Sequence, residues 1–216
     1  METRNTKIVL TVQATHNGTA DRILRKAREM FFGRGFIHVT MDELAYELGM
    51  SKRTLYEHFA GKKEILREAL LQQVSIVRAG LTKIEEDGEL DPVEKLEYVI
   101  PFISEALPRF SRQFLLDVQR SAPELWEEVD GHRTEMLEHF FRTLFLDGQA
   151  KGLFRSDLDL DLFLLLLRTL VQRAVTPEVL ARVPFSPAQV FKGIVSVLIR
   201  GIVTESGRNR FQQEYR

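Results

Sequence analysis

Residues 40–62, TMDELAYELGMSKRTLYEHFAGK, constrain the fold most because they predict two short helices joined by a tight turn. Thr40 can cap the first helix while Glu43, three residues later, reaches back to it, which is the pattern of a capping box. Gly49 tolerates the positive φ that ends a helix within one turn. Ser51 then stands where a residue is needed to cap the second helix.

Each of these two helices has an apolar face. The first presents Met41, Leu44, Ala45 and Leu48 at helical spacing, and the second presents Leu55 and Phe59. The other face of the second helix carries cations, hydroxyls and hydrogen-bonding rings, namely Lys52, Arg53, Thr54, Tyr56 and His58. Such groups suit phosphate oxygens and base edges, so the pattern indicates a helix-turn-helix with a reading helix. On spacing alone, a helix pair that serves only for packing fits equally well.

The stretch from about Ile23 to Leu66 resembles the DNA-binding domain of the TetR family of bacterial transcriptional regulators. The residues that carry the resemblance are Ala27, Phe31 to Phe36, Thr40, Leu44, Ala45, Gly49, Ser51, Thr54, Leu55, Tyr56, His58, Phe59, Lys62 and Leu66. The string T-L-Y-x-H-F-x-x-K after G-x-S is specific to that family. The resemblance covers about a fifth of the chain. At position 53 many relatives have a small residue where this chain has Arg53, so the role of Arg53 is open.

The resemblance implies roles for individual residues on DNA. Thr40, Tyr56 and Lys62 would bind phosphates, Lys52, Arg53 and Thr54 would read bases, and Ser51 and His58 would orient the helix or touch the DNA backbone. The charge distribution fits this assignment. Residues 1–63 hold 11 Lys and Arg against 7 Asp and Glu, a net charge of +4, and the whole-chain charge of −1 leaves −5 for residues 64–216.

The rest of the chain predicts an all-α fold in which residues 19–63 form the helix-turn-helix domain and residues 64–216 form a larger helical domain, and the resemblance implies that this larger domain binds an effector and dimerises. A linking helix with Ile65, Leu66, Ala69 and Leu70 on one face begins near Lys62. Pro92, Pro123 and Ser186-Pro187 mark the starts of later helices. Residues 1–18 show no helical period, and we expect a flexible extension there.

The two most apolar helices are expected near residues 159–175 and 187–205, and they need partners on more than one side. In the TetR family the last two helices pair with their twofold mates, so the resemblance implies a homodimer. The expected interface residues are Leu164, Leu167, Val171, Phe191, Ile194, Val195, Leu198 and Ile202. A twofold protein matches a pseudo-palindromic operator.

The resemblance also implies a small-molecule effector that binds in the C-terminal domain and releases DNA. Candidate lining residues are Phe102, Phe110, Phe114, Trp126, Met136 and Phe140. Aromatic rings and methionine favour an apolar or aromatic ligand, although such residues at helical spacing are more often core.

Other chemistry finds little support in the sequence. Asp157-x-Asp159-x-Asp161 resembles the start of a calcium loop, but Leu162 and Arg168 stand where that loop needs glycine and glutamate. The histidines lack metal-ligand spacing, and no catalytic or nucleotide-binding motif is present, so we expect no cofactor, no metal site and no enzyme activity.

The chain has no cysteine, which excludes disulfides and fits a reducing compartment. No apolar run is long enough to span a membrane, and no signal segment stands at the N-terminus, so we expect a soluble cytoplasmic protein without a membrane partner.

The sequence favours a TetR-like regulator, most simply a repressor that acts as a homodimer on double-stranded DNA. Two alternatives stay open. One is a DNA-binding protein of the same fold without an effector, and the other is a helical small-molecule-binding protein or enzyme with a vestigial helix-turn-helix.

Overall fold

The computed structural model describes residues 18–107 and 109–211, and it shows an all-α chain, as expected. The expected extension at residues 1–18 lies almost entirely outside the described residues. The helices are α2 (Thr19–Arg34), α3 (Met41–Leu48), α4 (Lys52–His58), α5 (Lys62–Glu86), α6 (Pro92–Ala106), α7 (Arg112–Ser121), α8 (Pro123–Ala150), α9 (Leu160–Ala174), α10 (Pro177–Leu180), α11 (Pro187–Ile202) and α12 (Glu205–Phe211). Within the described ranges, β structure is limited to one isolated bridge between Phe154 and Val203.

Local capping places the ends of α3 and α4 where the sequence predicts them. The Thr40 hydroxyl accepts from the backbone N–H of Glu43 at 3.1 Å, and the Thr40 N–H donates to the Glu43 carboxylate at 2.8 Å. Gly49 has a φ of 63°, a left-handed conformation that stops α3. The Ser51 hydroxyl accepts from the N–H of Thr54 at 3.0 Å and starts α4.

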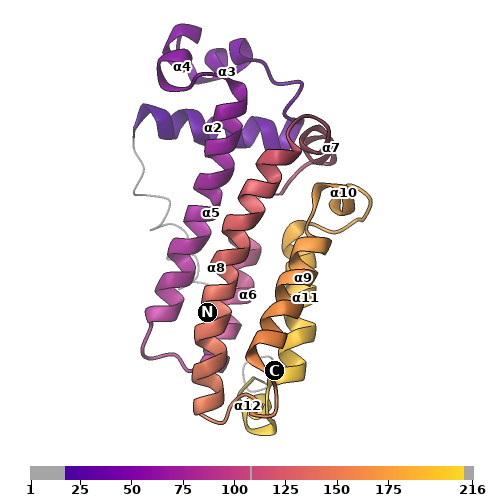
Figure 1. Cartoon of the computed structure of the whole chain (residues 1–216). Coiled ribbons are helices and arrows are strands. Elements are labelled where there is room, and N and C mark those ends of the chain that lie inside the picture. The colour runs from indigo at the N-terminus through magenta and orange to yellow at the C-terminus, as the bar shows by residue number, and fades with distance from the viewer. Residues whose placement is uncertain (1–17, 108, 212–216) are drawn as a thin grey trace.

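Helices α2, α3 and α4 lie at one end of the molecule (Figure 1), and their buried side chains belong to the same apolar core as those of the later helices. Ile23, Ala27, Phe31, Leu44 and Leu55 are completely buried there. The expected core residue Phe59 is also buried, whereas Leu48 is half-buried. Since α4 is only seven residues long, its position depends on this packing more than on its own helix propensity.

The 25-residue helix α5 joins this end to the rest of the chain (Figure 1). Its first turns bury Ile65 and Leu66, and its later turns bury Val77, Leu81 and Ile84. The domain boundary expected between residues 63 and 64 therefore falls within the first turn of α5. The two parts of the chain share this helix.

Helices α5, α6 and α8 run side by side, with α9 and α11 packed together along them (Figure 1). Prolines open α6, α8 and α11 at the first helical position, as the sequence predicts. Gly80 on α5 lies directly against the ring of Phe102 on α6, and Gly148 on α8 lies against the ring of Phe154. These glycines allow neighbouring segments to approach closely.

The sequence did not predict α12, because its residues are mostly polar and show no apolar period. Thr204 fixes the start of this helix, since its hydroxyl bonds to the carbonyl of Leu153 at 3.1 Å and accepts from the N–H of Gly207 at 3.2 Å. None of the helices in the described residues is both long enough and apolar enough to cross a bilayer.

Candidate functional site

The outer face of α4 holds most of the side chains expected to read DNA. The Arg53 side chain is 88% exposed and pairs with Glu57 on the next turn at 3.1 Å. Lys52 is exposed and bonds to Asp42 of α3 at 2.9 Å. Tyr56 and His58 are also exposed. Both ion pairs lie in water, where such pairs contribute little, so the cations can exchange their carboxylates for phosphates or bases.

Thr40, Ser51 and Thr54 have a different part in the structure. The hydroxyls of Thr40 and Ser51 cap α3 and α4. The hydrogen bonds that Thr40 donates also keep the pKa of the Glu43 carboxyl below its usual range. Thr54 is half-buried, and its hydroxyl lies 2.9 Å from that of Ser51. These three hydroxyls therefore help to fix the ends of α3 and α4.

Lys62 lies at the start of α5, as expected, but its ammonium group is held by the protein. Nζ donates to the carbonyls of Ile37 and Val39 at 3.0 and 2.9 Å, and it lies 4.7 Å above the ring of Phe36. Burial lowers the pKa of Lys62. The side chain thus anchors the segment between α2 and α3 to α5 and retains one proton for an outside acceptor.

The same segment is held from the other side by Asp117 of α7, a residue the sequence did not single out. Its carboxylate is 2% exposed and accepts from the backbone N–H of Ile37 at 2.8 Å and from the amide of Gln113 at 2.6 Å. The N–H of Ser111 also donates to the carbonyl of Phe32 at 2.8 Å. Because Asp117 and Ile37 are 80 residues apart in sequence, no local pattern could have revealed this contact.

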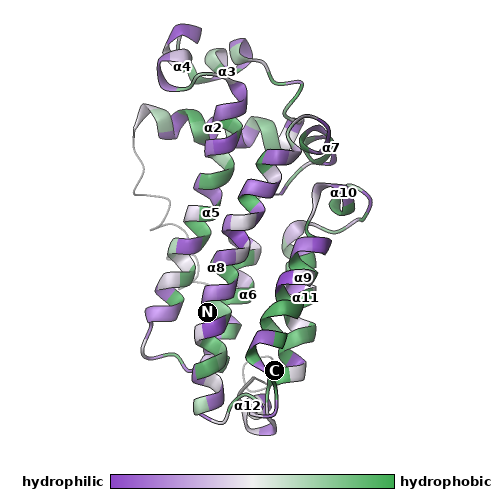
Figure 2. Ribbon diagram, in the orientation of Figure 1, coloured by the Kyte–Doolittle hydropathy of each residue, from purple (hydrophilic) through white to green (hydrophobic). Residues whose placement is uncertain are grey.

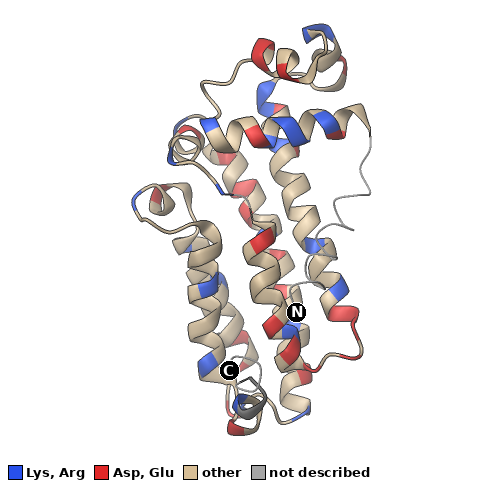
Figure 3. Ribbon diagram, turned by 180° about the vertical axis from the view of Figure 1, so that it is seen from behind, with Lys and Arg blue, Asp and Glu red and all other residues tan. Residues whose placement is uncertain are grey.

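Tyr46 of α3 is a second residue that the sequence did not single out. Tyr46 is 86% exposed, and it lies in the last turn of α3, three residues before Gly49, which ends that helix. Cations also gather on this end of the molecule, along α2 and around α4 (Figure 3). An exposed ring beside exposed cations is typical of a surface that meets nucleic acid.

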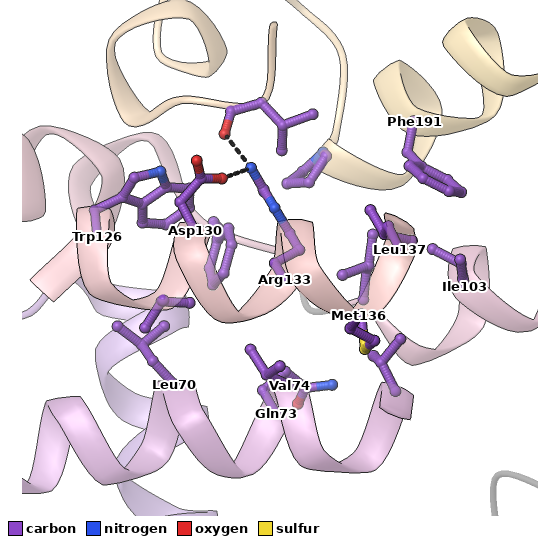
Figure 4. A pocket seen from close by; sticks show the side chains of 16 residues that line it. Leu70, Gln73, Val74, Ile103, Trp126, Asp130, Arg133, Met136, Leu137 and Phe191 are labelled. Atoms are coloured by element: carbon purple, nitrogen blue, oxygen red, sulfur yellow. Dashed lines mark hydrogen bonds and ion pairs between the residues drawn. The ribbon is translucent and has the colours of Figure 1, made fainter. Parts of the chain in front are cut away.

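A cavity lies between α5, α6, α8 and the start of α11 (Figure 4). Its volume is about 70 Å³, and its walls are almost entirely apolar. Arg133 of α8 faces it, paired with Asp130 on the same helix and with the carbonyl of Val175 at 3.4 Å. Burial lowers the pKa of the Arg133 guanidinium, and the Asp130 carboxylate opposes that effect.

Comparison with known proteins decides the family. Residues 23–69 match the family described as bacterial regulatory proteins, tetR family. The HTH-type transcriptional regulator NfxB of Pseudomonas aeruginosa is 32% identical over 139 residues, which cover 64% of this chain and 72% of that protein. The chain belongs to the TetR family of bacterial transcriptional regulators. It is therefore a DNA-binding helix-turn-helix regulator and not an enzyme.

Other TetR-family proteins match over most of their length. The HTH-type transcriptional repressor KstR2 of Mycolicibacterium smegmatis is 27% identical over 87% of this chain and 92% of its own. The crystal structure of the TetR-family regulator PfmR from Thermus thermophilus is 26% identical, with a TM-score of 0.57, and covers 83% of this chain and 97% of that one.

Three of the six residues expected to contact a TetR-type effector line the cavity, namely Phe110, Trp126 and Met136. The other three pack elsewhere. Phe102 fills the space above Gly80, Phe114 packs against Phe32 at 4.9 Å between ring centroids, and Phe140 packs against Phe141 at 5.4 Å. The sequence missed Arg133 and Asp130, although their spacing of three residues places both on one side of a helix.

Most of the expected dimer residues are enclosed within the protomer. Leu164, Leu167, Val171, Phe191, Val195 and Ile202 are buried inside the protomer, and Ile194 and Leu198 are half-buried. The exposed apolar side chains of the same two helices are Leu162, Leu165, Leu166, Leu170 and Val197. Apolar residues recur along both helices (Figure 2), and on α9 they lie on the exposed face as well as on the face that packs within the protomer.

The three aspartates at 157–161 have structural roles. Asp159 caps α9 by accepting from the N–H of Leu162 at 2.8 Å, Asp157 pairs with Arg155, and Asp161 pairs with Arg142. In the described part of the chain no cluster of three His, Asp or Glu side chains is arranged to hold a metal ion.

Proposed function

We propose that this TetR-family regulator is a repressor that binds a pseudo-palindromic operator as a homodimer and leaves it when a small molecule fills the cavity. The observation that carries the proposal is the exposed face of α4, whose Lys52 and Arg53 follow a capped helix start at the free end of the molecule. The name of KstR2 as a repressor supports the sign of regulation.

On DNA, Arg53 and Lys52 read base edges, while Tyr56 and His58 contact the sugar-phosphate backbone. Thr40, Ser51 and Thr54 hold the reading helix in position through the hydrogen bonds described above. Lys62 does the same for the segment before α3, and its remaining proton is free for a phosphate. Tyr46 adds a further contact from α3.

The dimer forms through the exposed apolar stripe of α9 and the adjoining surface of α11. Leu162, Leu166 and Leu170 are four residues apart and share one face of α9, beside Leu165. Val197 of α11 is 73% exposed. Contiguous exposed apolar side chains mark interaction sites in proteins of this size. A second copy is the occupant that an operator with twofold symmetry requires.

Leu166→Glu tests the dimer directly. A carboxylate in the centre of an apolar interface has no partner and opposes association, so the variant is expected to elute as a monomer where the wild type elutes as a dimer. Light scattering after size exclusion gives the mass. Leu146→Glu on α8 is the matched control, because Leu146 is about equally exposed and lies off this stripe. A dimeric Leu166→Glu protein would place the interface elsewhere.

Operator binding is tested by a mobility-shift titration on the DNA that flanks the gene, with excess random competitor at near-physiological salt. Retardation that survives competitor and maps to an inverted repeat supports the proposal. Binding that random competitor DNA abolishes would contradict the proposal, because it shows only nonspecific attraction between the protein's cations and DNA phosphates. Release of this complex by apolar small molecules tests the effector half separately.

Arg53→Ala is expected to weaken operator binding about tenfold and to reduce discrimination against base changes in the half-site, because a guanidinium that reads a base edge is lost. Lys83→Ala, an exposed cation on the distant part of α5, is the control and should bind like the wild type. If Arg53→Ala weakens random and operator DNA by the same factor, Arg53 binds a phosphate rather than a base.

A further inference from the structure

A second, larger hollow adjoins the apolar cavity. It is a groove of about 710 Å³ between the connection from α6 to α7 and the segment that leads from α10 into α11. The cavity and the groove share three wall residues, Leu107, Phe110 and Pro187. A ligand that displaces these side chains could therefore place one end in the cavity and the other in the groove.

The groove is cationic. Arg109, Arg112 and Lys192 line it, and no aspartate or glutamate is among its wall residues. All three cations are exposed, and in the described part of the chain none of them lies within 4.0 Å of a carboxylate. Their charge is therefore open to a ligand.

Two helices also begin at this groove, which adds to its positive potential. Arg112 is the first residue of α7, and Ser186 caps α11 directly before Pro187. The unpaired N–H groups and the dipole of a helix start favour an anion. The cations and both helix starts act in the same direction.

The apolar cavity has the opposite preference. Asp130 already neutralises Arg133 there, so a carboxylate placed inside would leave one uncompensated negative charge among apolar walls. Placing a neutral oxygen atom in this cavity costs less free energy than placing a carboxylate there. The indole Nε1 of Trp126 and the Nε of Arg133 are buried N–H donors that have no hydrogen-bond partner in the described structure.

We propose that the effector is an amphipathic anion, with an apolar body in the cavity beside Trp126 and an anionic head in the groove beside Arg109, Arg112 and Lys192. This inference rests on the proposed effector site and specifies the chemistry that the site selects. A carbonyl or ether oxygen near the start of the apolar body accepts from the two unpartnered N–H groups. The head is a carboxylate or a phosphate, and three cations favour the greater charge of a phosphate.

The cavity must widen to take such a body. Its 70 Å³ is below the roughly 300–1,000 Å³ of pockets that hold drug-sized ligands. Its walls include α5, which begins at the reading domain, and α6, which leads through Leu107 to α7 and Asp117. Widening it displaces the two elements that hold Ile37 in place. Binding of the ligand and loss of operator affinity are coupled through that displacement.

The experiment uses the fluorescence of Trp126, the one tryptophan of the chain, as a reporter inside the cavity. The full-length protein is titrated with decanol, decanoate and decyl phosphate below their aggregation concentrations, since these share one apolar chain and differ in the head. Decyl phosphate is expected to bind about tenfold more tightly than decanol, with decanoate between them. Added salt should reduce this difference without changing the affinity for decanol.

Variants separate the groove from the cavity. Arg112→Ala and Lys192→Ala should each weaken decyl phosphate about fivefold and leave decanol unchanged. Arg120→Ala is the matched control, because Arg120 is an exposed cation of the same α7 that does not line the groove. Lys192→Glu, which alters only an exposed side chain, should weaken decyl phosphate further than Lys192→Ala and leave decanol unchanged, because it lowers the positive charge of the groove without removing Arg109 and Arg112.

Equal affinity for decanol and decyl phosphate, or no response to the groove variants, would overturn the inference and leave the effector site standing. If no probe changes the fluorescence of Trp126 and no probe releases operator DNA, the proposal that the cavity is an effector site is overturned as well. Operator binding by the free protein, measured in the same samples, judges the DNA-binding half of the proposed function independently.

Discussion

Replacing Asp117 with alanine is expected to lower the free energy of unfolding by about 3 kcal/mol, because it removes the buried charged acceptor of two part-buried hydrogen bonds. The N–H of Ile37 and the amide of Gln113 both donate to this carboxylate, which is completely enclosed. Denaturant unfolding followed by circular dichroism gives the value. Asp117→Asn keeps one acceptor oxygen and should lose less.

Asp161→Ala is the control for this measurement. Asp161 is an exposed aspartate that pairs with Arg142 at 3.3 Å, and a surface pair of this kind contributes less than about 1 kcal/mol. A similar loss for the two variants would show that Asp117 does no more than a surface charge. The folded Asp117→Asn protein should also bind operator DNA more weakly, because a neutral amide oxygen accepts from the N–H of Ile37 less strongly than the carboxylate and holds the segment before α3 less firmly.

Gly80→Ala is expected to lower the free energy of unfolding by about 2 kcal/mol, although alanine is the better helix former. A methyl group on Gly80 would overlap the ring of Phe102, which is completely buried on α6 and has no room to move away. The strain of this overlap exceeds the gain of about 1 kcal/mol in helix propensity. Thermal and denaturant unfolding measure the net change.

Gly131→Ala provides the comparison within the same protein. Gly131 lies inside α8, is exposed, and has no atom within 4 Å of an added Cβ. Alanine there should raise the free energy of unfolding by somewhat less than about 1 kcal/mol. A stabilising Gly80→Ala would mean that α5 and α6 are not as closely packed as described.

The features of the fold that the sequence predicted are those set by neighbouring residues. The Thr40 and Ser51 caps, the left-handed Gly49 and the prolines that open α6, α8 and α11 all depend on residues within four positions of each other. The TetR-type string from Thr54 to Lys62 also predicted that a further helix, α5, begins near Lys62, shortly after the end of α4. The exposure of Lys52, Arg53, Tyr56 and His58 on α4 followed from the same local pattern.

The parts of the site that the sequence could not predict depend on residues far apart in the chain. Periodicity indicates that α9 is apolar on several faces, but it cannot tell which face packs within the protomer, so it does not separate the buried Leu164 and Leu167 from the exposed Leu162 and Leu166. Similarly, an aromatic stripe does not distinguish Phe114, which packs against α2, from Trp126, which lines a cavity. Asp117 carries no local signature at all.

The sharing of α5 has a consequence for how new regulators of this type could arise. If a flexible linker joined the N-terminal and C-terminal parts, recombination between two genes at the linker could combine the helix-turn-helix of one protein with the C-terminal part of another. Here any such junction falls inside a continuous helix that packs against α2 as well as against α6 and α8, and that buries Ile65 and Leu66 in its first turns and Val77 and Leu81 in its later ones. A functional hybrid must therefore preserve the rotational phase of α5 across the junction. An insertion of one residue would turn one of its two apolar faces by about 100° away from its core.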